Sequence, residues 1–219
     1  MNTLERLMGG IARVRTMRLF LENPDRVVTA EELAKSSAIS IISARREIRF
    51  LRSVALIAPA KRVDEIIKHK KTRRKKVSGF RFAPTFPLTG PLRNLLIGAS
   101  PVSREKIVRY CKNRNGVRLV VVGGAFINAA ASPEDTIPLS EYLEFEHAVD
   151  LLIVGQRAQR STYDPLVKQL EAEMGRELSW VFLTPTEFEH RMAMHDKFLR
   201  DLFDYPHEIL INKLGNIIK

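Results

Sequence analysis

Cysteine is almost absent from the 219 residues, because the chain contains only Cys111. One cysteine excludes a disulfide within the chain and a zinc site built from several cysteines. We expect Cys111 to be a small buried residue of a helix. Long apolar runs are also absent, since no segment approaches the ~18 residues of a membrane-spanning helix. The first residues carry no hydrophobic signal region, so we expect a cytoplasmic protein.

Positive charge is concentrated in the first part of the chain. The sequence has 36 Lys and Arg residues against 25 Asp and Glu residues, a formal net charge of +11. Residues 1–90 hold 20 of the basic and 8 of the acidic residues, and residues 91–219 hold 16 and 17. This asymmetry indicates binding to nucleic acid or to an anionic membrane. We favour nucleic acid, because the basic residues do not lie opposite a wide apolar helix face.

An arginine-rich helix is predicted from Ser40, a good N-cap, to Leu51. Ala44, Ile48 and Leu51 recur at helical spacing, so they form an apolar stripe that must face a core. The remaining surface could enter the major groove of DNA. A solvated cationic face is the alternative for such a helix taken alone. The residues assigned to this contact are Ser40, Ile42, Ser43, Arg45, Arg46 and Arg49.

A basic hairpin is predicted after this helix. Two β-prone runs, 61–67 and 77–82, flank a turn in which almost every residue is basic. Repulsion among these like charges makes a polyanion the natural stabilising partner. A disordered, solubilising loop is the alternative. The residues assigned to phosphates or to a minor groove are Lys68, Lys70, Lys71, Arg73, Arg74, Lys75 and Lys76.

The order of elements before the hairpin is typical of a winged helix-turn-helix. An amphipathic helix from Leu4 to Leu21 is expected to stop at Asn23-Pro24-Asp25. Thr29 and Glu32 form a capping box that opens a short second helix. The arginine-rich helix and the basic hairpin complete the series, so we assign residues 1–90 to this DNA-binding fold.

Residues 91–219 are predicted to form a second domain. After a connecting helix at 88–97, apolar strand runs alternate with helical segments, which indicates an α/β domain. The expected strands are 117–122, 149–155, 178–183 and 208–211, and the expected helices are 103–115, 165–174, a segment capped at Thr184, and 195–203.

Two motifs of this second domain resemble those of a known family. One strand ends in Gly123-Gly124, and the next opens with Val149-Asp150. The arrangement resembles the nucleotidyltransferase superfamily, which has a small polymerase-β-like fold. The whole chain is similar to prokaryotic regulators that join a winged helix to such a domain. That likeness is carried by Ser43-Ala44-Arg45-Arg46-Glu47-Ile48, Thr184-Pro185-Thr186-Glu187-Phe188 and Phe198-Leu199-Arg200-Asp201.

Departures from the family pattern imply that the second domain is inactive. Two-metal nucleotidyl transfer needs clustered carboxylates to hold Mg²⁺. The family's first aspartate would fall at Ala148, the strand 178–183 supplies no carboxylate, and the family's serine is replaced by Gly124. We therefore expect Gly123, Gly124 and Asp150 to be a vestigial site with no metal, no cofactor and no catalysis.

Two further features of the second half are interpreted as solvent-facing. The acidic connection Ala129 to His147 is taken as a solvated loop, with masking of the hairpin or partner binding as alternatives. His190, His195 and His207 lack the carboxylate spacing of a metal site, and we expect His190 and His195 at solvent-facing helix positions.

The sequence thus predicts a two-domain α+β and α/β protein. An N-terminal winged helix-turn-helix precedes a nucleotidyltransferase-like domain with a small mixed sheet. We expect a transcriptional regulator of double-stranded DNA, whose second domain serves dimerisation, sensing of an unknown effector, or partner binding. An active divergent nucleotidyltransferase and a sequence-independent DNA-coating or chromosome-organising protein are the alternatives.

Overall fold

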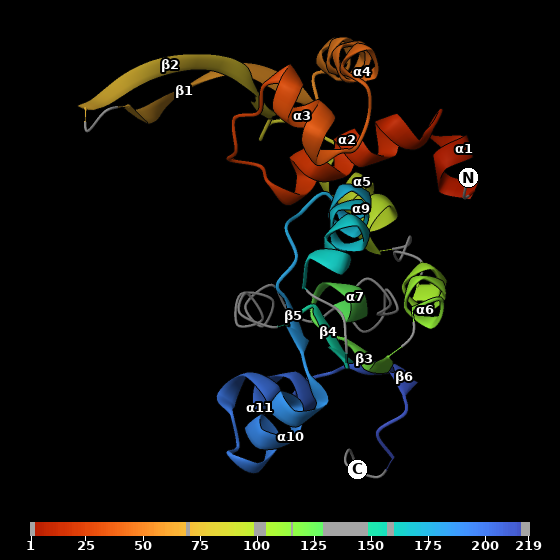
Figure 1. Cartoon of the computed structure of the whole chain (residues 1–219). Helices are drawn as coiled ribbons and strands as arrows, with labels where there is room; N and C mark the ends of the chain where they lie inside the picture. The colour runs from red at the N-terminus through yellow and green to blue at the C-terminus, as the bar shows by residue number, and fades with distance from the viewer. Residues whose placement is uncertain are drawn as a thin grey trace. The chain divides into compact units, whose positions relative to one another are not determined.

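The computed structural model describes residues 3–68, 71–98, 104–114, 116–128, 149–156 and 160–215. These ranges have a mixed α/β structure with two small sheets (Figure 1). The acidic connection Ala129 to His147 lies outside them. The chain separates into two compact units, Met1–Ile97 with Gln169–Arg176, and Gly98–Lys168 with Glu177–Lys219.

The first unit begins with α1 (Thr3–Leu7), α2 (Ile11–Glu22), α3 (Ala30–Ser36) and α4 (Ile41–Ser53). The expectation of one helix across the first 21 residues is wrong. Gly9 and Gly10 have φ values of 87° and 132°, outside the helical region, and they separate α1 from α2. Both predicted N-caps are confirmed: Thr29 forms a capping box with Glu32, and the Ser40 hydroxyl accepts a hydrogen bond from the backbone of Ser43.

Strands β1 (Ile57–Lys68) and β2 (Lys71–Phe82) form an antiparallel hairpin that extends away from α3 and α4 (Figure 1). The hairpin is confirmed, but the broad cationic turn is not, because cross-strand pairing continues through the basic residues of β2. Val28 holds the base of the hairpin by exchanging two backbone hydrogen bonds with Phe80, at 2.8 and 2.9 Å. Gly79 permits this approach, since a Cβ there would lie 2.6 Å from the Val28 carbonyl oxygen.

The core of the first unit is formed by apolar side chains of α2, α3, α4 and the base of the hairpin. Ala44, Ile48 and Leu51 are buried in it, which confirms the predicted stripe of α4. Beyond the hairpin, the predicted connecting helix appears as α5 (Thr89–Arg93) and the π-helix η1 (Asn94–Gly98).

A segment distant in sequence completes the first unit. Gln169–Arg176 contains the last part of α9 (Asp164–Met174) and the turn after it. The buried Arg18 donates from Nη1 to the Glu173 carbonyl at 2.7 Å and from Nε to the Leu96 carbonyl at 2.8 Å. Gly175 lies so close to α2 that a Cβ would be 2.6 Å from the backbone carbon of Arg18.

The second unit is built on a mixed sheet in the order β5-β4-β3-β6. Strand β3 is antiparallel to β4 and β6, whereas β4 and β5 are parallel, in agreement with the predicted small mixed sheet. The strands are β3 (Val117–Val122), β4 (Leu151–Gly155), β5 (Trp180–Leu183) and β6 (Glu208–Asn212). The other elements are α6 (Arg104–Lys112), α7 (Ala125–Asn128), η3 (Arg160–Thr162), α10 (Pro185–Ala193) and α11 (Lys197–Asp204).

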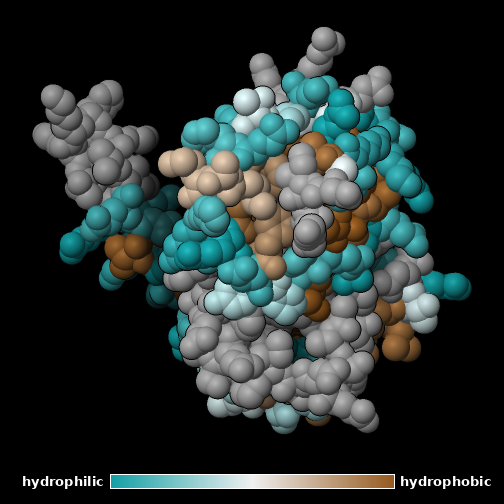
Figure 2. Space-filling view, turned by 90° about the horizontal axis from the view of Figure 1, so that it is seen from below, coloured by the Kyte–Doolittle hydropathy of each residue, from teal (hydrophilic) through white to brown (hydrophobic). Residues whose placement is uncertain are grey.

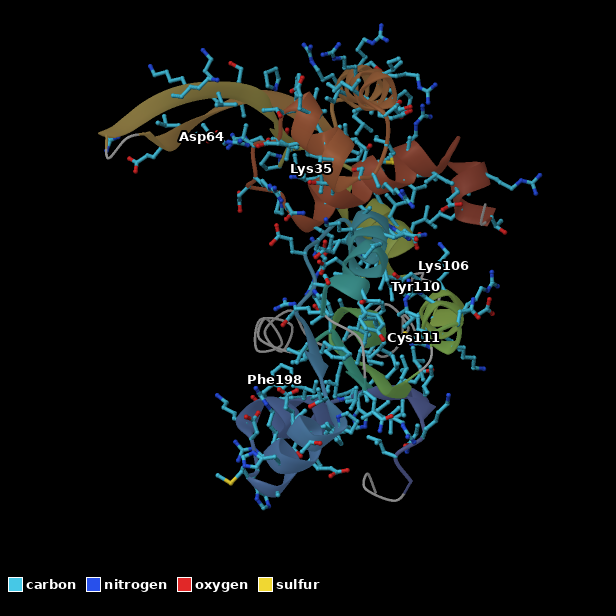
Figure 3. All side chains as sticks on the ribbon, viewed as in Figure 1. Lys35, Asp64, Lys106, Tyr110, Cys111 and Phe198 are labelled. Atoms are coloured by element: carbon cyan, nitrogen blue, oxygen red, sulfur yellow. The ribbon has the colours of Figure 1, made fainter. Side chains whose placement is uncertain are left out.

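The structure tests the predictions for Cys111 and His195 in the second unit. Cys111 of α6 is fully buried, as expected, and its burial raises the pKa of the thiol to about 12 (Figure 3). His195 is exposed but not helical: its φ is 51°, and α11 begins only after Asp196, whose carboxylate caps the helix. Within the described ranges, no helix is long and apolar enough to cross a membrane.

Candidate nucleic-acid interface

One side of α4 presents cationic side chains to solvent. Ile42, Arg45, Arg46 and Arg49 are all exposed and recur at i, i+3, i+4 and i+7, so they form one continuous stripe. The side chains of Arg45 and Arg46 are each 65% accessible. Several nitrogen-tipped side chains extend outward around α4 (Figure 3). The structure therefore brings the predicted arginines together on one surface, opposite the buried stripe of the same helix.

A buried carboxylate holds α4 against α2, and no local pattern of the sequence predicts its burial. Glu47 is 2% exposed. Its Oε2 accepts a hydrogen bond from Arg13 Nε of α2 at 2.9 Å, and its Oε1 accepts one from Arg46 Nε at 3.3 Å. The Arg13 guanidinium also lies 3.7 Å from the centre of the Phe50 ring. The pair therefore adds to the apolar stripe of α4 in holding this side of the helix inward, because a buried charge must keep its partner.

The two serines assigned to DNA contact, Ser40 and Ser43, form hydrogen bonds within α4. Ser40 Oγ accepts from the backbone N–H of Ser43 at 3.1 Å and also bonds the Ser43 hydroxyl at 2.9 Å. Both hydroxyls therefore take part in the cap of α4. Arg45 faces Glu31 at 3.6 Å, but both side chains are largely exposed, and such pairs contribute little. The Ser43 hydroxyl accepts from Ser40 and keeps its own proton for another acceptor, so it remains on the surface beside the arginines.

The hairpin carries basic side chains on both of its faces. Arg74, Lys75 and Lys76 are exposed and consecutive on β2, so they alternate between the two faces. Glu65 engages Arg74 at 3.1 Å, and Asp64 lies opposite Lys75 in the register. The described side chains of the hairpin form a mainly hydrophilic surface (Figure 2). Of the other residues assigned to this surface, the side chains of Lys68, Lys70, Lys71 and Arg73 lie outside the described part of the chain.

Arg62 connects the hairpin to α3, although no local pattern separates it from the other basic residues of the sequence. Its guanidinium donates to Glu32 Oε2 at 2.8 Å and to Asp64 Oδ1 at 2.7 Å, and it also bonds the Val27 carbonyl. The Arg62 hydrogen bond lowers the pKa of Glu32 to about 2. The same contacts raise the pKa of Arg62 and lower the pKa of Asp64. This arginine is therefore engaged by the protein and stabilises the base of the hairpin.

A groove lies between the end of α4 and the base of the hairpin. It has a volume of about 590 Å³ and is lined by Arg52, Pro59, Lys61, Ser78 and Phe80, among others. The Arg52 guanidinium lies 5.7 Å from the centre of the Phe80 ring. Two cationic side chains thus extend the basic surface from α4 toward the hairpin, and the sequence alone did not indicate that they would converge.

The residues of the predicted vestigial site lie together in the second unit, and the carboxylate of Asp150 accepts hydrogen bonds from the backbone. Asp150 is fully buried. Its Oδ1 accepts from the backbone of Ala125 at 2.8 Å, its Oδ2 accepts from the backbone of Ser179 at 2.8 Å, and its carbonyl accepts from Gly123 at 3.0 Å. Gly124 has a φ of 46°, which allows the tight turn into α7. Asp150 thus joins the β3–α7 turn to the start of β5.

Metal-binding residues do not converge in the described ranges, which hold no group of three or more His, Cys, Asp or Glu side chains placed to bind an ion. His190 is exposed, whereas His207 is half-buried against Phe203, with 5.3 Å between ring centres. Comparison of the chain with family models, curated proteins and solved structures found no match.

Proposed function

We propose that the protein is a transcriptional regulator that binds double-stranded DNA through a winged helix-turn-helix in its first unit. The exposed arginine stripe of α4 carries this proposal, because α4 stands beside a long basic hairpin in the same compact unit. In this arrangement α4 enters the major groove, and the hairpin holds phosphates or the adjacent minor groove.

The contacts that hold α4 and the hairpin in place favour sequence-specific contacts to base edges over non-specific binding to phosphates. Arg13 and Glu47 join α4 to α2, and Arg62 fixes the base of the hairpin against α3. Rigidly placed side chains can be matched to base edges, whereas a flexible cationic tail binds any phosphate backbone. Arg45 and Arg49 are the residues that we assign to guanine, the commonest partner of arginine in the major groove.

For the second unit we propose a nucleotidyltransferase-like domain without catalytic activity, which serves dimerisation, effector sensing or partner binding. The hydrogen bonds of Asp150 support the lack of catalysis, since both oxygens of this buried carboxylate accept from backbone N–H groups. A catalytic carboxylate would instead have to face a metal ion and the substrate phosphates.

The experiment that tests the regulator proposal is selection of DNA fragments from a genomic pool by the purified protein. Binding is carried out near physiological salt with competitor DNA, and the retained fragments are sequenced. Enrichment of a few related sites, above all inverted repeats, is the expected result and would indicate a dimer. Uniform retention that disappears with added salt would instead identify a coating protein that does not discriminate sequence.

A further inference from the structure

An apolar side chain begins the arginine stripe of α4. Ile42 is 79% exposed, the highest value for a large hydrophobic residue in the described ranges. It is the second residue of α4, and the arginines that follow at i+3, i+4 and i+7 lie on the same side of the helix. The other described side chains do not cover Ile42. Packing in the core of the first unit therefore does not explain why an isoleucine stands here.

The position of Ile42 matches the part of a helix that meets base edges in the major groove. Residues of the first turn reach the bases when a helix enters the groove with its N-terminal end. Ser40 and Ser43 flank it, and their hydroxyls are hydrogen-bonded to each other, while Ser40 Oγ also accepts from the Ser43 backbone. Ile42 is therefore the most prominent side chain of the first turn, and it offers only apolar surface.

The major groove offers one apolar feature to such a side chain, the C5-methyl group of a pyrimidine. Resting on the proposed function, we infer that Ile42 is a specificity-determining residue that contacts a pyrimidine C5-methyl group beside the base read by Arg45 or Arg49. Thymine carries this methyl group, and so does 5-methylcytosine. An isoleucine would remove the methyl surface from water and would disfavour unmethylated cytosine and uracil at that position.

The test uses the full-length protein and a DNA site obtained by the genomic selection. In one series of duplexes each thymine is replaced in turn by uracil, and in a second series each cytosine is replaced by 5-methylcytosine. The expected result is a position where loss of the methyl group in the first series lowers the affinity about fourfold, or where its addition in the second series raises the affinity about fourfold, as expected for one buried methyl group. The first series detects a thymine, and the second detects a methylated cytosine.

Ile42→Ala is expected to bind the methylated and unmethylated duplexes equally, with an unchanged affinity for random DNA. Leu7→Ala is the matched control, because Leu7 is an exposed aliphatic residue of α1, at 73%, outside α4 and the hairpin, and should leave the methyl effect intact. Thermal unfolding verifies that both variants fold. The inference is overturned if the wild-type protein ignores every methyl replacement, or if Ile42→Ala keeps the preference. If the selection enriches no site at all, both the proposed function and the inference on Ile42 are overturned.

Discussion

Arg13 Nε and Glu47 Oε2 lie 2.9 Å apart and join α2 to the buried side of α4. Replacing Glu47 by alanine leaves the Arg13 charge without its partner in a largely buried position. We expect Glu47→Ala to lower the free energy of unfolding by about 3 kcal/mol, the lower end for a broken buried pair, because Arg13 keeps some contact with water. Urea denaturation measures the loss. Glu31→Ala removes the exposed partner of Arg45 and should change stability by less than about 0.5 kcal/mol; equal losses would contradict the structural role of Glu47.

The hairpin should contribute affinity without sequence preference. In a variant with Arg74, Lys75 and Lys76 changed to alanine, we expect weaker binding to every DNA tested and a smaller dependence of affinity on salt. The slope of log K against log salt should fall by about 0.9 for each phosphate that the variant no longer neutralises. Filter binding at several salt concentrations measures the slope. Removing three exposed charges of the second unit, Lys112, Lys197 and Arg200, is the control; an unchanged slope in the hairpin variant would exclude the hairpin from DNA binding.

Arg45 and Arg49 should determine sequence preference. Arg45→Ala and Arg49→Ala are each expected to weaken binding to the selected site by about 1–3 kcal/mol for an arginine that reads a guanine, with much smaller effects on random DNA. Competition between the two DNAs measures the difference. If each variant loses the same affinity for both, these arginines contact phosphates only.

The Arg62–Glu32 contact should make stability depend on pH in the acid range. Binding to Arg62 lowers the pKa of Glu32 from 4.5 to about 2, so the contact stabilises the folded state above about pH 4.5. That stabilisation should disappear as the pH falls from 4.5 to about 2, where Glu32 becomes protonated in the folded state too. Glu32→Gln can still form the capping box, so it isolates the ionic contact.

We therefore expect Glu32→Gln to be less stable than the wild-type protein at about pH 7, with a difference that shrinks below about pH 4.5. Chemical denaturation midpoints at about pH 7, 4 and 2.5 provide the measurement. A difference that is constant over this range would show that Glu32 stabilises the unit only through hydrogen bonds that glutamine cannot reproduce.

Asp150 should be a structural residue. Asp150→Ala removes two charge-assisted hydrogen bonds that a fully buried carboxylate accepts from the backbones of Ala125 and Ser179, and we expect a loss of about 3 kcal/mol in the stability of the second unit. Asp204→Ala, at an exposed position, is the control. We expect no transfer of label from radioactive nucleoside triphosphates with Mg²⁺ or Mn²⁺. Transfer by the wild-type protein that Asp150→Ala abolishes would instead establish an active enzyme.

Local features of the fold were predictable because neighbouring residues determine them. The caps at Thr29 and Ser40, the buried stripe of α4 and the run of β3 follow from spacing and hydrogen-bonding capacity within a few residues. The boundaries of α1 and α2 were missed because hydrophobic periodicity persists across Gly9 and Gly10, whereas the backbone does not remain helical there.

The non-local features were not predictable from these patterns. The burial of Glu47 depends on Arg13 of another helix, and the role of Arg62 depends on the register that places β1 beside the capping box of α3. Asp150 was recognised as part of a motif, but its engagement by Ala125 and Ser179 requires three segments to meet. Pairings between distant segments are set by tertiary packing, which no window of sequence contains.

The inclusion of Gln169–Arg176 in the first unit has a consequence for biosynthesis. Domains that are continuous in sequence can fold as soon as they leave the ribosome. Here the carbonyl that receives Arg18 and the glycine that packs on α2 are translated long after the hairpin. The first unit can therefore reach its final packing only when synthesis has passed residue 176, so a truncated nascent chain or an early proteolytic fragment would carry the basic surface on an incomplete core.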